Sequence, residues 1–158
     1  MGNIFSGSEV IELGIEIEKN GRDFYDALAA KSKSEGSRAT FLKLAREEEK
    51  HLALFRGMLD KAGSSEAAES YSDEYNGYMR ALASESIFTS KDKGREIANS
   101  VKTQTEAIEL GIGFEKDSIL FYEGMKKAVP RYDHKVIDEL IKEEQSHLRI
   151  LRELKISK

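Results

Sequence analysis

The sequence predicts an all-α fold in which two similar helical hairpins form a four-helix bundle. Three observations support this class. The composition favours helices, because charged residues make up 34% of the 158 residues, with one proline and no tryptophan. The chain contains an internal repeat, and apolar residues recur at helical spacing within each copy. The length suits one domain with a full hydrophobic core, so we expect residues 1–158 to fold as a single unit.

The internal repeat is clearest in two pairs of segments. Residues 11–25, IELGIEIEKNGRDFY, align without gaps on residues 108–122, IELGIGFEKDSILFY, and nine of the fifteen positions are identical. Residues 44–55, LAREEEKHLALF, align on residues 140–151, LIKEEQSHLRIL, at nearly the same offset. Because the two pairs share their internal spacing, each copy is predicted to be a hairpin of two helices.

Periodicity places four long helices in two hairpins. The expected helices span about residues 7–33, 37–61, 103–128 and 132–155. The first hairpin therefore covers residues 7–61, the second covers residues 103–155, and residues 62–102 connect them. A connection of this length is too long for a simple up-down-up-down bundle, so we expect the second and third long helices to run parallel.

Capping residues agree with this division. Glu9 and Glu106 each stand three residues after a candidate cap, which is the spacing of a capping box. The predicted N-caps, in chain order, are Ser6, Ser37, Thr103 and Asp133. The first six residues, MGNIFS, also match an N-myristoylation pattern, but short motifs match often by chance, so we interpret them as a lead-in to the first helix.

The connection carries one predicted short helix between two breaks, KAGSSEAAES and FTSKDKG. Its apolar face consists of Tyr71, Tyr75, Tyr78, Met79 and Leu82. This face packs either on the bundle or on a partner subunit. Because it offers apolar surface beyond what the bundle core requires, we expect a homodimer, and the long connection would also permit the hairpins to be exchanged between subunits.

Composition excludes several classes of function. A net charge of −4 gives no basic field for nucleic acid. No apolar run approaches the ~20 residues that a membrane span needs, and no secretory signal is evident, so neither a membrane nor an extracellular role is expected. The absence of cysteine excludes disulfides, thiolate zinc sites and iron–sulfur centres. We expect a cytoplasmic protein.

Carboxylates occupy positions where a bundle core should be apolar. Glu18 lies on the inward stripe of the first helix, and Glu115 lies at the matching position of the third. The second and fourth helices each carry an inward E-x-x-H pair. These pairs are Glu48 with His51 and Glu144 with His147. All four helices thus place a carboxylate at the same level of the inner face.

Four buried carboxylates need positive charge nearby, because burying even one isolated carboxylate costs several kcal/mol of folding free energy. No lysine or arginine lies on these stripes at that level. The i, i+3 spacing lets a glutamate and a histidine bind the same ion, and two divalent cations would cancel four carboxylate charges. The pattern therefore predicts a dinuclear metal site. Its predicted ligands are Glu18, Glu48, His51, Glu115, Glu144 and His147.

Other polar residues near these motifs receive simpler interpretations. Glu47, Glu49 and Glu143 are expected on solvated faces, and His134 at a helix start. The small residues beside the helix 1 and helix 3 glutamates are expected to leave room for metal and a small ligand; they are Gly14, Gly21, Gly111 and Ser118. Tyr25 and Tyr122 are either core aromatics or hydrogen-bond donors to a ligand carboxylate. The oxygen-rich ligand set with two imidazoles suits iron or manganese, and zinc or another divalent metal can substitute.

These motifs resemble those of ferritin-like di-iron carboxylate proteins, and among them the rubrerythrin-like group. The matching elements are Glu18-x6-Tyr25 with Glu48-x-x-His51, and the same pattern from Glu115 to His147. The resemblance covers all four long helices and implies a ferritin-like four-helix bundle with a long crossover. It also implies that Glu18 and Glu115 each bind one metal, that Glu48 and Glu144 bridge the two, and that His51 and His147 each bind one.

The resemblance implies two alternative functions. One is an oxidoreductase that reacts with peroxide or O₂ at two iron ions and receives electrons from an external donor. The other is a non-catalytic iron- or metal-binding protein. Two departures bear on the choice. The chain lacks the cysteines of a rubredoxin domain. The resemblance also implies an additional metal-site glutamate on the third long helix, but the positions one turn from Glu115 are Ile112 and Ser118.

Overall fold

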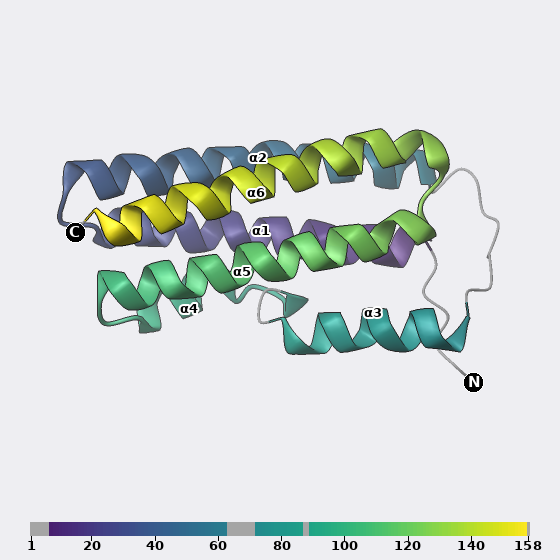
Figure 1. Cartoon of the computed structure of the whole chain (residues 1–158), viewed down its shortest axis with the longest axis horizontal. Helices are drawn as coiled ribbons and strands as arrows, with labels where there is room; N and C mark the ends of the chain where they lie inside the picture. The colour runs from purple at the N-terminus through teal and green to yellow at the C-terminus, as the bar shows by residue number, and fades with distance from the viewer. Residues whose placement is uncertain (1–6, 63–71, 87–88, 158) are drawn as a thin grey trace.

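The computed structural model describes residues 7–62, 72–86 and 89–157, and every regular element among them is helical. Four long helices form the bundle: α1 Gly7–Lys31, α2 Glu35–Ala62, α5 Gln104–Met125 and α6 His134–Ile156. Two short helices, α3 Asp73–Glu85 and α4 Gly94–Ser100, lie in the crossover (Figure 1). Short 3-10 turns at Lys126–Ala128 and Arg131–Asp133 join α5 to α6. The predicted all-α bundle is confirmed.

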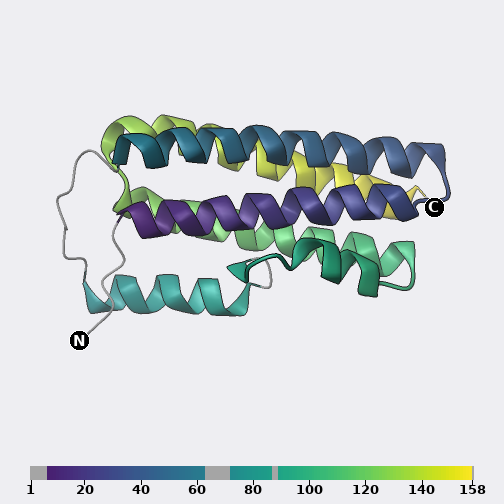
Figure 2. The ribbon, with the colours of Figure 1, turned by 180° about the vertical axis from the view of Figure 1, so that it is seen from behind.

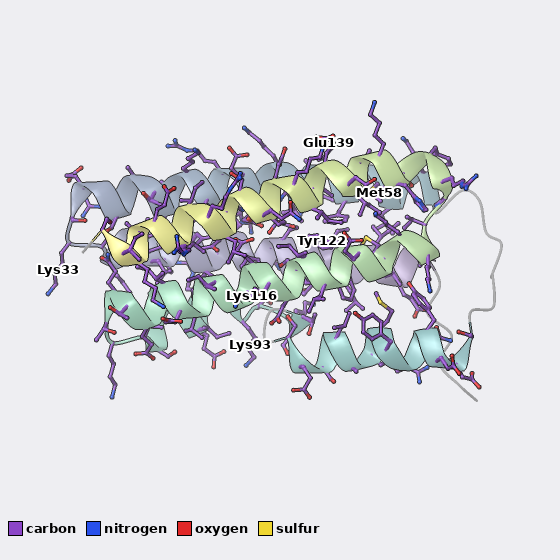
Figure 3. The ribbon with its side chains drawn as sticks, in the orientation of Figure 1. Lys33, Met58, Lys93, Lys116, Tyr122 and Glu139 are labelled. Atoms are coloured by element: carbon purple, nitrogen blue, oxygen red, sulfur yellow. The ribbon has the colours of Figure 1, made fainter. Side chains whose placement is uncertain are left out.

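The direction of the helices follows from the length of the connections. α1 and α2 run antiparallel, as do α5 and α6, and the crossover brings α5 back in the same direction as α2 (Figures 1 and 2). The predicted parallel arrangement of the second and third long helices is therefore correct. Figure 3 shows Tyr122 within the bundle and the charged side chains of Lys33 and Glu139 at its outside.

Two of the predicted caps are confirmed in position and one is wrong. Thr103 Oγ1 accepts a hydrogen bond from the backbone N–H of Glu106 at 3.1 Å, as a capping box requires. Asp133 precedes α6, but its side chain makes no capping bond. α2 starts two residues before the expected position, because Ser34 Oγ accepts from the Ser37 N–H at 3.1 Å and Ser34 is thus the cap. Ser6 and the rest of MGNIFS lie outside the described residues.

The predicted apolar face of the crossover is largely covered within the chain. Met79 is fully buried, and the Tyr75 hydroxyl donates to the Gly124 carbonyl at 2.8 Å. Leu82 packs partly against the core, whereas Tyr78 remains 48% exposed. Tyr71 lies outside the described residues. Packing on the bundle therefore accounts for most of this face, and the homodimer stays a prediction.

The sequence did not predict α4, because seven residues are too few to show a clear period. Tertiary contacts hold it in place. The buried side chain of Asn20 donates to the Ser90 carbonyl at 2.7 Å and accepts from the N–H groups of Lys93 and Gly94 at 2.9 and 3.1 Å. A Cβ atom on Gly94 would lie 2.1 Å from the backbone oxygen of Asn20. The crossover thus docks on α1 two residues from Glu18.

No helix in the described ranges has the length and apolar character required to cross a membrane.

Replacing Gly94 with alanine should destabilise the protein, because the added methyl group meets backbone that cannot move independently of α1. We expect a loss of about 1–3 kcal/mol in the free energy of unfolding, typical of overpacking. Chemical denaturation of the metal-free protein measures it. The matched control is Gly57→Ala, where a Cβ meets nothing within 4 Å and alanine should stabilise the helix slightly. Equal stability of Gly94→Ala and wild type would contradict the docked position of α4.

Candidate metal centre

The structure brings all six predicted ligands together in the interior of the bundle. Glu18 comes from α1 and Glu115 from α5, while α2 and α6 each supply a glutamate and a histidine one turn apart. The four glutamates and His51 are fully buried, and His147 is 3% exposed. No lysine or arginine is among the buried polar residues in the described part of the chain. The cluster therefore carries concentrated negative charge without a buried cationic side chain.

The six residues fall into two overlapping groups that can each hold a metal ion. One group is Glu18, Glu48, His51 and Glu144, and the other is Glu48, Glu115, Glu144 and His147. Within each group, one potential ligand atom per residue lies within 4.8 Å of the others. Because Glu48 and Glu144 belong to both groups, their carboxylates lie between the two positions.

The two histidines use the same ring nitrogen toward the cluster. Nδ1 of His51 lies 2.7 Å from Glu144 Oε1 and 3.4 Å from Glu18 Oε2. Nδ1 of His147 lies 2.9 Å from Glu48 Oε1 and 3.5 Å from Glu115 Oε1. The imidazole rings stack with their centroids 5.7 Å apart and 15° between their planes. The internal repeat of the sequence thus becomes an approximate twofold arrangement in the site.

The polar atoms of the cluster are suited to a metal rather than to one another. Ten buried side-chain nitrogen or oxygen atoms in the described residues lack a hydrogen-bond partner, and eight of them belong to these six residues. They include Nδ1 of both histidines and both carboxylate oxygens of Glu48 and of Glu144. The close approaches of His51 and His147 to carboxylates therefore do not satisfy hydrogen-bond geometry. Carboxylate oxygens and imidazole nitrogens are ligand atoms that bind iron, manganese and zinc.

The concentration of buried carboxylates shifts the pKa values within the cluster. Burial, followed by the charges of neighbouring carboxylates, raises the pKa of Glu48 and of Glu144 well above the ordinary value. Burial also acts to raise the pKa of Glu18, but the charge of His51 and close contacts with Glu48, His51 and Tyr122 outweigh it and lower this pKa. Burial lowers the pKa of His51, yet the charge of Glu18 and other carboxylate contacts raise it to about 10. Metal binding must therefore displace protons.

Each tyrosine of the repeat binds a glutamate of the other hairpin. The Tyr25 hydroxyl, on α1, donates to Glu115 Oε1 at 2.6 Å, and the Tyr122 hydroxyl, on α5, donates to Glu18. Burial and the nearby carboxylates raise the pKa of both hydroxyls well above the ordinary value, so both stay protonated donors. Of the two interpretations of these tyrosines, the structure supports hydrogen bonding to a candidate ligand.

Glu143 lies on a solvated face, as predicted, but it also contacts one of the predicted ligands. Its carboxylate contacts Nε2 of His51, on the side of the ring opposite the cluster, while the side chain stays 50% exposed. Sequence spacing could not reveal this contact, because Glu143 is on α6 and His51 is on α2. The other two flanking glutamates behave as expected. Glu49 pairs with Arg22 at 2.7 Å, and Glu47 lies 3.8 Å from Lys50.

The small residues beside the glutamates do not provide open space for a ligand. A Cβ atom on Gly21 would lie 2.5 Å from the Phe114 ring, and one on Gly14 would lie 3.0 Å from the Met125 side chain. At Gly111 the nearest atom, at 3.1 Å, belongs to Leu151. These glycines instead allow large apolar side chains to pack around the cluster. His134 begins α6, as expected.

Comparisons with known proteins agree with this geometry. Residues 9–155 match the family model described as rubrerythrin. The crystal structure of a protein described as ferritin-like and diiron-carboxylate, from Thermotoga maritima, matches with a TM-score of 0.77 at 26% sequence identity. That match covers 98% of this chain and 97% of the other. No curated protein shows significant similarity to the sequence.

The metal-free protein should lose stability as the pH rises. A raised pKa stabilises the folded state fully below the unfolded value, and this stabilisation is lost as the pH rises through the folded value. For His51 the window runs from the ordinary 6.5 to about 10. Glu48 and Glu144 act in the same direction above 4.5, whereas the lowered pKa of Glu18 opposes them only near and below 4.5. Thermal unfolding of chelator-treated protein at a series of pH values measures the effect.

The double variant Glu48→Gln with Glu144→Gln serves as the control for this pH dependence. Because neutral amides replace two carboxyls whose pKa is raised well above the ordinary value, the metal-free variant should remain folded with a shallower decline. Metal-loaded protein should show the opposite trend, since protons compete with metal for the same side chains. A melting temperature of metal-free wild type that increases across the His51 window would contradict the charge arrangement described above.

Proposed function

The chain belongs to the rubrerythrin family, and we propose that it is an oxidoreductase whose dinuclear metal centre, containing iron, reacts with peroxide or O₂. The observation that carries the proposal is the fully buried cluster of four glutamates and two histidines, divided into two groups that share two carboxylates. A structural role alone does not explain eight buried polar atoms without hydrogen-bond partners in one cluster.

We assign the ligand roles from the membership of the two groups. Glu18 and His51 belong to the first position, and Glu115 and His147 belong to the second. Glu48 and Glu144, common to both, are the proposed bridging ligands. Residues in this arrangement would hold a pair of ions, and the ions of two-metal sites are generally about 3.5–4 Å apart. Four carboxylates against two divalent cations give a neutral core, which makes the burial tolerable.

Iron suits the proposed reaction because two adjacent iron(II) ions can together supply the two electrons that reduce a peroxide. The side chains of the protein contribute binding, orientation and exclusion of water. Tyr25 and Tyr122 hold the proposed terminal ligands Glu115 and Glu18 through hydrogen bonds and each retain a proton at the hydroxyl. The buried rings of Phe114 and Phe55 pack against Tyr25 and Tyr122. The electrons must come from a separate donor.

Rapid mixing of anaerobic, iron(II)-loaded protein with peroxide or O₂ tests the function. We expect two iron ions per chain, oxidation much faster than that of iron(II) in buffer, and repeated cycles when an external reductant is added. Glu47→Gln, which changes a half-buried carboxylate of α2 outside the cluster, is the matched control and should behave as wild type. Stoichiometric metal binding with no accelerated oxidation would instead establish the non-catalytic metal-binding alternative.

Replacing Tyr122 with phenylalanine should preserve the fold and weaken the orientation of Glu18. The ring packs against Phe55 with centroids 5.2 Å apart, and phenylalanine keeps that contact while it removes the hydroxyl. Removal of such outer partners typically lowers metal affinity or activity about 10–100-fold. Competition titration with a chromogenic chelator and the oxidation rate measure both effects. Unchanged affinity and rate would show that this hydrogen bond has no functional role.

A further inference from the structure

The two halves of the candidate centre differ in one contact despite the internal repeat. On the His51 side, Nδ1 faces the buried carboxylates and Nε2 contacts the carboxylate of Glu143. The position that corresponds to Glu143 in the first repeat is Glu47, because the second aligned segments are offset by 96 residues. A symmetric site would therefore pair Glu47 with His147.

The structure does not contain that symmetric contact. Among the described residues, no carboxylate lies within ion-pair distance of Nε2 of His147, whose close partners are all at Nδ1. Glu47 is instead near Lys50, at 3.8 Å on its own helix, and its side chain is 27% exposed. The two imidazoles therefore differ in their surroundings: His51 has a carboxylate at Nε2, and His147 has none among the described residues.

An outer carboxylate changes what an imidazole offers to a metal. A neutral imidazole carries one N–H proton. When a carboxylate accepts a hydrogen bond from Nε2–H, it favours the tautomer with that proton on Nε2, so Nδ1 presents its lone pair to the cluster. The same hydrogen bond fixes the ring orientation and makes Nδ1 a more basic ligand for a metal ion. His51 is held in this way from α6, whereas His147 has no equivalent carboxylate at Nε2.

We propose that Glu143 is a positioning residue that acts through His51 and makes the Glu18–Glu48–His51–Glu144 position the tighter of the two, so that it fills first. This inference rests on the proposed dinuclear centre. It further implies that the two metal ions are inequivalent although the ligands form two matching sets. The expected difference in affinity is about 10-fold or more, the usual effect of such outer partners.

Titration of metal-free protein with zinc(II), followed by NMR of the imidazole nitrogens and their protons, tests the order of filling. The chain has only three histidines, so the spectrum is simple. In wild type, His51 signals should change with the first equivalent and His147 signals with the second. The Nε2–H of His51 should give a shifted, slowly exchanging proton signal, because a carboxylate accepts it. A general loss of packing would not produce this site-specific pattern.

Two matched variants separate Glu143 from its repeat partner. In Glu143→Gln the first binding step should weaken about 10-fold, the two histidines should respond together, and the shifted proton signal should disappear. Glu47→Gln should leave the order and both affinities unchanged. Calorimetry with cobalt(II) provides the affinities independently, and thermal unfolding of the metal-free variants verifies the fold. Glu143→Asp, which keeps the charge, should restore part of the difference.

The outcomes distinguish this inference from the proposed function. Two zinc ions that bind in wild type with simultaneous changes at His51 and His147 would overturn the inference and leave the dinuclear centre intact. The same conclusion follows if Glu143→Gln and Glu47→Gln have equal effects. A wild-type protein that binds no metal would overturn both the inference and the proposed function.

Discussion

The burial of four carboxylates at one level of the bundle is the constraint on which the rest of the structure depends. Glu18, Glu48, Glu115 and Glu144 are fully buried, and no lysine or arginine is buried with them in the described residues. Such an arrangement is unstable unless positive charge is added. Two divalent cations supply that charge in the proposed functional state, and when the metals are absent the cluster favours protons on Glu48, Glu144 and His51, whose pKa values are all raised.

The charge constraint also explains which neighbours surround the cluster. Tyr25 and Tyr122 satisfy one oxygen each of Glu115 and Glu18, so that these carboxylates keep their second oxygen for a metal. Glu48 and Glu144 make no such bond and keep both oxygens, as a ligand shared by two ions requires. The hydrogen-bond pattern and the group membership thus divide the four glutamates in the same way, although they are independent observations.

The sequence predicted those features that depend on local spacing. The six clustered residues could be named because a helix brings positions i and i+3 to one face and because the repeat shows the same pattern twice. Features that depend on tertiary packing could not be read in this way. The contact of Glu143 with His51 joins two helices, α4 is held by Asn20 rather than by its own pattern, and Phe114 fills the space beside Gly21. The start of α2 was missed because Ser34 and Ser37 are both good caps, and only the structure shows which one binds.

The contacts of the centre also hold the two hairpins together. His51 approaches Glu144, and His147 approaches Glu48, so each histidine of one hairpin faces a glutamate of the other. The two tyrosine hydrogen bonds and the Glu143 contact cross between the hairpins in the same way. Metal bound here would therefore link α1 and α2 to α5 and α6 directly, in addition to the apolar packing. Because the residues of the centre also form contacts between the two hairpins, a substitution that alters metal affinity also affects how the hairpins pack together. The two effects can be separated only when stability is measured without metal and affinity is measured in the folded protein.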